Sequence, residues 1–207
     1  MEEQSAPRAG NEEVFHLLVR TLNSFTREAI KKDDNAAVCD VLYSYKELAR
    51  RLLVDHPGQL PRLVRYLGYY AEFARARGLP FIYGRLSHEL CALTELAYRH
   101  KVAPAGQMLD AVLAFDGAAQ SLGLIKSRAL LGGYFLEQGL APELARVLAS
   151  LREVEPATIE RARREILAAQ ERLFWEINDH GVNFDFVEPQ RRTRVMELFD
   201  RLAAVEG

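Results

Sequence analysis

The 207-residue chain contains only two cysteines and no long apolar run, so it has little that could form disulfide cross-links or a membrane anchor. Two cysteines cannot build the dense disulfide framework of a small secreted domain. Both fall inside helical patterns, so we interpret Cys39 and Cys91 as reduced, packed thiols. No apolar run approaches the roughly 18 residues of a membrane span, and residues 1–4 are acidic and polar, unlike a secretory signal. We therefore expect a cytoplasmic protein that does not insert into a membrane.

An excess of charge of either sign is missing too. The 27 Lys and Arg residues are balanced by 29 Asp and Glu residues, which gives a net charge of −2. Nucleic-acid-binding domains are usually strongly basic, so we expect no nucleic-acid partner. A chain of this length buries roughly 70% of the surface that its unfolded form exposes, so its folding requires neither a disulfide nor a metal.

Sequence motifs of common active sites and cofactor sites are also missing. No serine lies in a Gly-x-Ser-x-Gly elbow, and no Gly-x-x-x-x-Gly-Lys segment is present for phosphate binding. Glu13 and His16 have the spacing of a ligand pair on one helix, but a carboxylate-bridged di-iron bundle needs a second Glu-x-x-His and two further glutamates. His88 and Cys91 form a similarly isolated pair. We therefore expect no catalytic residues, cofactor or metal, and favour a non-enzymatic role, with an enzyme left open.

The chain is instead dominated by a recurring helical pattern. Amphipathic stretches of about 15 to 20 residues alternate with short breaks that contain Pro, Gly, Asn or Asp. The pattern predicts nine helices, over about 11–32, 36–54, 61–77, 80–100, 104–122, 124–138, 142–153, 156–178 and 189–205. Between the last two, residues 180–188 alternate as a β-strand does.

Each expected helix has an apolar side that should face the core. On the first helix we expect this side to consist of Val14, Leu17, Leu18, Leu22, Phe25 and Ala29. On the second helix we expect it to consist of Val38, Leu42, Tyr45, Ala49 and Leu52.

These elements predict an all-α fold of about nine antiparallel helices, because the connections between them are short. The arrangement is either an irregular, solenoid-like array of α-hairpins or an orthogonal bundle. We favour the array, since residues 11–54 and 57–100 form two hairpins of similar length. Residues 1–10 lack periodicity and are expected to be a disordered tail or linker, followed by one helical domain over 11–207 with a possible subdivision near residue 140.

The third expected helix has two apolar sides. The first side is a wide core face made of Leu60, Leu63, Val64, Leu67, Tyr70, Ala71 and Ala74. A second side lies directly beside it, and we name it the Arg–Tyr strip: Arg62, Tyr66, Tyr69, Phe73 and Arg77. A core needs only the first side, so the strip either packs on a neighbouring helix, with its arginines extending past that helix, or anchors a partner protein.

Trp175, the only tryptophan, points away from the core face of the eighth expected helix. Either residues 182–187 fold back and cover its ring, or the ring anchors a partner.

We therefore expect a cytoplasmic protein-interaction or scaffold module that binds a protein partner through an aromatic and arginine surface. Self-association remains open. One alternative is that the chain is the cytosolic domain of a membrane-anchored or signalling protein. Two weaker alternatives are a helical-bundle metal protein that uses Glu13 and His16, and a sensor that binds an anionic small molecule at the Arg–Tyr strip.

Overall fold

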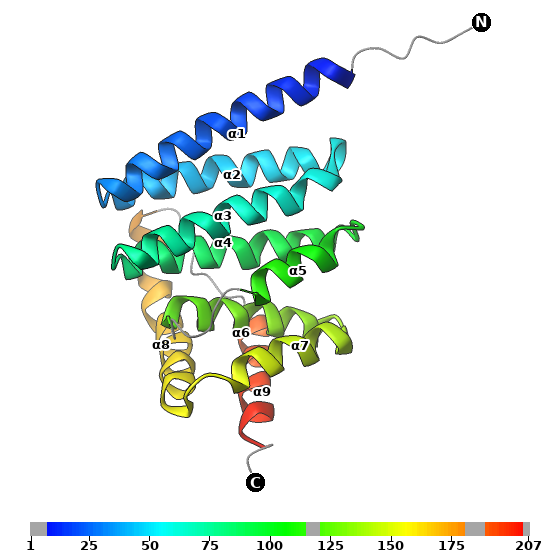
Figure 1. Ribbon diagram of the computed structural model, residues 1–207. Helices are drawn as coiled ribbons and strands as arrows, with labels where there is room; N and C mark the ends of the chain where they lie inside the picture. Colours follow the sequence, from blue (N-terminus) through cyan, green and yellow to red (C-terminus); the bar gives the residue numbers. More distant parts are fainter. Residues whose placement is uncertain (1–7, 115–120, 181–188, 205–207) are drawn as a thin grey trace, which may run out of the picture.

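The computed structural model describes residues 8–114, 121–180 and 189–204, with the backbone alone described for 8–12, 169–180 and 189–190. Within these ranges the fold is all-α, without a strand (Figure 1). Its helices are α1 (Arg8–Lys31), α2 (Asn35–Asp55), α3 (Leu60–Ala76), α4 (Pro80–Arg99), α5 (Ala105–Leu113), α6 (Leu122–Glu137), α7 (Ala141–Arg152), α8 (Pro156–His180) and α9 (Pro189–Ala203). A single 3-10 turn, η1 (Pro57–Gln59), precedes α3.

Two helix boundaries differ from the sequence-based expectation. Helix α1 begins at Arg8 rather than near residue 11, and α5 ends at Leu113 rather than near residue 122. The expected strand-like segment lies outside the described residues, except for His180, which ends α8.

The helix ends follow local sequence signals. The side chain of Asp34 accepts a hydrogen bond from the Ala37 amide at 3.0 Å and so caps the start of α2. Gly78 and Gly139 follow α3 and α6 with positive φ angles of 69° and 68°, which glycine adopts without strain. Short turns therefore separate α1 from α2, α3 from α4, and α6 from α7.

Helices α1 to α4 lie one after another at one end of the molecule, and α8 and α9 run across the others at the opposite end (Figure 1). Helix α1 forms the edge of this arrangement: it packs on α2 and α3 on one side and meets no described helix on the other. Helix α6 lies in the middle, in contact with α4, α7, α8 and α9.

Glycines permit the closest helix packing around α6. A Cβ placed on Gly123 would lie 2.6 Å from the Cα of Gly84 in α4, and one on Gly133 would lie 2.6 Å from a methyl group of Val195 in α9. Such distances are too short for any larger residue. The backbones of α4 and α6 therefore nearly touch at their crossing.

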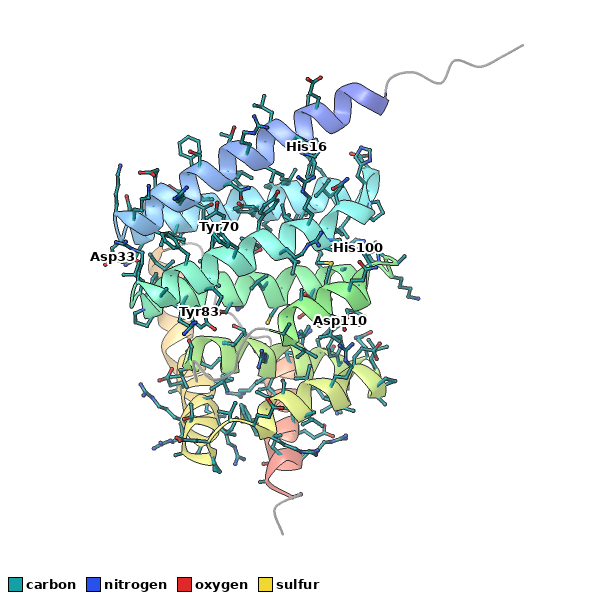
Figure 2. The ribbon with its side chains drawn as sticks, viewed as in Figure 1. His16, Asp33, Tyr70, Tyr83, His100 and Asp110 are labelled. Atoms are coloured by element: carbon teal, nitrogen blue, oxygen red, sulfur yellow. The ribbon has the colours of Figure 1, made fainter. Side chains whose placement is uncertain are left out.

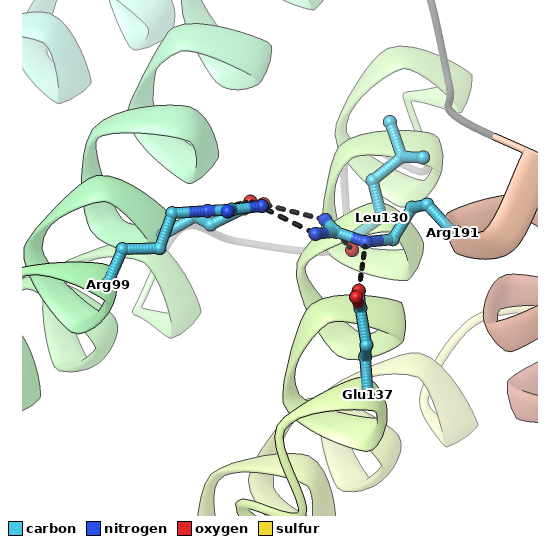
Figure 3. Close-up of polar contacts among 5 residues, drawn as sticks. Arg99, Leu130, Glu137 and Arg191 are labelled. Carbon is cyan, nitrogen blue, oxygen red and sulfur yellow. Dashed lines mark hydrogen bonds and ion pairs between the residues drawn. The ribbon is translucent and has the colours of Figure 1, made fainter.

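An ion-pair network joins α9 to the two central helices (Figure 3). Arg191 donates to Glu95 of α4 at 2.8 Å and to Glu137 of α6 at 3.2 Å. Its guanidinium group also lies 5.2 Å from the centre of the Tyr134 ring. Burial opposes the charge of Arg191, but the two carboxylates outweigh it and raise the pKa of Arg191. The network thus fixes where α9 crosses the core.

Candidate binding surface

The two ends of the Arg–Tyr strip lie against α1. Arg62 places Nη1 3.3 Å from Nδ1 of His16, and its Nε donates to the hydroxyl of Tyr66 at 3.3 Å. Arg77 donates to the backbone oxygen of Lys31 at 3.2 Å, where the last carbonyl groups of α1 lack helical partners. Both arginines therefore contact a neighbouring helix of the same chain.

The middle of the strip is covered unevenly. Tyr66 and Phe73 are half-buried, whereas 63% of Tyr69 is exposed. The Tyr69 ring packs edge-on against Tyr70 with the ring centres 5.2 Å apart. Tyr70 lies at the junction of α1 and α3, where its hydroxyl donates to the backbone oxygen of Asn23 at 2.9 Å (Figure 2). Tyr69 is thus the most solvent-facing aromatic of the strip, beside the α1–α3 junction.

Trp175 belongs to α8, but its side chain lies outside the described residues, as do residues 182–187.

The two residue pairs with the spacing of metal ligands, Glu13 with His16 and His88 with Cys91, belong to no larger cluster of ligands among the described residues. His16 faces Arg62, and Cys91 is buried, which raises the pKa of its thiol to about 12. Among the described residues, no group of three or more His, Cys, Asp or Glu side chains could hold a metal ion.

The inward side expected for α1 is wrong. Four of its six members are among the most exposed large apolar side chains of the described residues: Val14 at 57%, Leu17 at 63%, Leu18 at 47% and Phe25 at 61%. A second side of the same helix is buried instead, formed by Phe15, Val19, Thr26 and Ile30 together with Ala29, the one expected member that is buried. The outer side is the surface that sequence reasoning assigned to the core.

The exposed apolar side of α1 runs from Val14 to Phe25 and ends at Glu28, which lies in the same arc and pairs with Lys31 at 2.7 Å. At 100° per residue its four large members fall within roughly 100° of arc, with Thr21 between them. The Thr21 hydroxyl donates to the backbone oxygen of Leu17 at 2.9 Å, so it adds no unsatisfied donor to this side. We name Val14, Leu17, Leu18, Thr21 and Phe25 the α1 strip. The other exposed large apolar side chains of the described residues are divided among α2, α3, α4 and α8.

Asn23 fixes the rotation of α1 and hence the direction of the α1 strip. Its side-chain oxygen accepts a hydrogen bond from the Tyr45 hydroxyl of α2 at 2.8 Å. Its backbone oxygen accepts the hydrogen bond from Tyr70 of α3. Two helices therefore hold the opposite side of α1, and the strip is directed away from both.

A small pocket lies between α2 and α4, on a different part of the surface. Its lining consists of Cys39, Leu42, Tyr43, Lys46, Arg85, His88 and Glu89. The cavity volume of about 20 Å³ is enough for a water molecule but not for an organic ligand. Glu89 is buried, with Oε2 3.5 Å from the Lys46 ammonium and with no hydrogen bond to Oε1 from the described residues.

Titration of Glu89 provides a test of this buried carboxyl group. Burial raises the pKa of Glu89 above its ordinary value of 4.5, against the attraction of Lys46. The folded state then holds this proton more tightly than the unfolded state, so the stabilising contribution is largest below about pH 4.5 and is lost as the pH rises to the folded-state pKa. Glu89→Gln removes the titration. Its free energy of unfolding should therefore improve relative to wild type as the pH rises above about 4.5, as measured by urea denaturation. A pH-independent difference would contradict the shift.

No helix within the described ranges is both long and apolar enough to cross a membrane. The described geometry places Arg62, Tyr66, Tyr69 and Phe73 on α3 and Arg77 at its C-cap, with both arginines against α1. Comparisons with protein-family models, with curated proteins and with solved structures found no match for this chain.

Proposed function

We propose that the chain is a protein-interaction module that binds a helix of another polypeptide along the α1 strip. The observation that carries this proposal is the concentration of exposed Val14, Leu17, Leu18 and Phe25 on one side of an edge helix whose other side is buried. Contiguous apolar surface on a soluble protein is typical of interaction sites. Apolar positions three, four and seven residues apart are the spacing with which one helix packs on another.

The hydrogen bonds that hold α1 against α2 and α3 support this role. The hydrogen bonds from Tyr45 and Tyr70 to Asn23 hold the helix in one rotation, so the strip does not have to be ordered during binding. A preorganised surface loses less conformational entropy on association, and more of its contact energy remains as affinity.

The expected class of function is thus retained, but its main surface changes. Arg62 and Arg77 are engaged with α1, which leaves Tyr69 as the exposed anchor of the Arg–Tyr strip. The apolar anchors of the proposed surface come from the neighbouring helix.

The test combines a double variant on the α1 strip with a matched control. Leu17→Asp with Phe25→Asp places two charges in the proposed contact, whereas Val54→Asp changes a still more exposed apolar site on α2, where Val54 is 82% exposed. Complexes purified from native cells are treated with an amine cross-linker. We expect partner cross-links to Lys31 or Lys32 in wild type and Val54→Asp, and their loss in the double variant with an unchanged melting temperature. Binding that the double variant leaves intact would contradict the proposal.

A further inference from the structure

We propose that the helix received by the α1 strip is α1 of a second copy of this chain, in antiparallel orientation about a two-fold axis near Arg20. This inference rests on the proposed function and names the partner. A two-fold contact uses the same surface on both copies, so that surface must be complementary to itself. The sequence of charges beside the strip meets this requirement.

Three exposed charged residues flank the strip on one side. Glu13, Arg20 and Arg27 are spaced seven residues apart, so they lie along the same edge of the helix. None of the three forms an ion pair with another described residue. The acid precedes the bases, and reversal of a second helix therefore brings opposite charges together.

The apolar and charged parts of the surface have the same centre. The midpoint between Val14 and Phe25 and the midpoint between Glu13 and Arg27 both fall near residue 20. In an antiparallel pair centred there, Glu13 of one copy faces Arg27 of the other, and symmetry repeats this pair. The apolar side chains of the two strips then meet along the same length of helix. In a parallel pair the two copies of this edge would lie on opposite sides of the interface, so Glu13 of one copy would not meet Arg27 of the other.

The helix dipole does not account for this order of charges. Acidic residues near the start of a helix and basic residues near its end do stabilise it, but the effect falls off within the first and last turns. Glu13 lies beyond the first turn and Arg27 lies before the last turn of this helix, which spans Arg8–Lys31. The polarity of the flank is therefore a property of the surface beside the strip.

The position of α1 also suits a second copy. Figure 1 shows α1 at the end of the stack, with α2 on its inner side. A second α1 would take the next place in the stack and leave the contacts of α1 with α2 and α3 unchanged. Arg20 would face its own copy at the axis, a like-charge contact at the solvent-exposed rim. Its replacement by glutamine should strengthen the dimer severalfold.

Sedimentation equilibrium of the purified full chain tests the inference at about 150 mM salt. We expect wild type and Val54→Asp to dimerise with the same dissociation constant, and Leu17→Asp to weaken the dimer at least 30-fold. Glu13→Arg and Arg27→Glu should each weaken it, and the double variant that carries both should restore it. Restoration is the signature of the antiparallel arrangement. Circular dichroism of each variant checks that the fold is intact.

The outcomes separate the second copy from other occupants. A monomeric wild type, a dimer that Leu17→Asp leaves unchanged, or a charge exchange that fails to restore dimerisation overturns the inference. If the chain is monomeric and cells yield a different protein cross-linked to α1, the second copy is overturned while the proposed function stands. If neither a dimer nor an α1-dependent complex forms, both are overturned.

Discussion

Arg191→Ala is expected to lower the free energy of unfolding by about 2–4 kcal/mol. The substitution leaves Glu137 without its arginine partner and leaves Glu95 with Arg99 alone, in a largely covered site. It also removes the cation–π contact with Tyr134, and with it the link from α9 to the two central helices. Only 12% of the Arg191 side chain is exposed, so water cannot fully replace these contacts.

Arg194 provides the matched control for Arg191, one turn further along α9. It pairs with Glu197 at 2.9 Å, but both side chains are exposed, at 47% and 37%. Exposed pairs on one helix contribute only about 0.5 kcal/mol, so Arg194→Ala should be close to neutral. Guanidinium denaturation of the three proteins measures the difference. Equal losses in the two variants would show that the Arg191 network does not hold the C-terminal helices in place.

Gly123→Ala should destabilise the protein by about 1–3 kcal/mol, whereas Gly84→Ala should be neutral or stabilising by up to about 1 kcal/mol. An added Cβ at Gly123 meets the Gly84 backbone at 2.6 Å, and only a separation of α4 from α6 relieves that clash. An added Cβ at Gly84 lies at an ordinary 3.6 Å from Gly123. The same mutation on the two sides of one contact thus has opposite consequences.

Thermal and chemical denaturation of both alanine variants test this asymmetry. The helix propensity of alanine favours both substitutions, so the difference between them isolates the close contact. A variant at Gly123 that is as stable as wild type would mean that the two helices lie further apart than described.

The order of the helices and the core faces of α2 and α3 could be predicted from the sequence. All five expected members of the inner side of α2 are buried, and all seven on the core face of α3 are buried. Regular spacing of apolar residues was sufficient there because each helix has a single dominant apolar side, or, in α3, one side that is plainly wider.

Helix α1 shows where periodicity stops being informative. It has two apolar sides of similar size, one around Leu18 and one around Val19, and either could have faced the core. The choice depends on Asn23, which accepts hydrogen bonds from Tyr45 and Tyr70. An asparagine in the middle of a helix carries no sequence signal for that role, because its partners lie 22 and 47 residues away.

Polar contacts between residues far apart in the chain could not be predicted from the sequence either. Arg191 and Glu95 are 96 residues apart and belong to helices whose relative position depends on the packing of α6. The Arg–Tyr strip lies beside the core face of α3, and its arginines follow the first alternative, whereas binding of a partner by the strip stays a prediction. Arg62 and Arg77 contact a neighbouring helix, and Tyr69 remains exposed.

Thiol labelling of α1 most directly tests the claim that its strip is a contact surface between chains. Leu18→Cys and Val19→Cys are compared with Val54→Cys, in separate proteins that lack Cys39. In dilute protein we expect maleimide to label positions 18 and 54 and to spare position 19, because Leu18 and Val54 are exposed and Val19 is buried. In the assembled complex, position 18 should become protected while position 54 stays reactive. Labelling of position 18 at the rate of position 54 in both states would contradict the account.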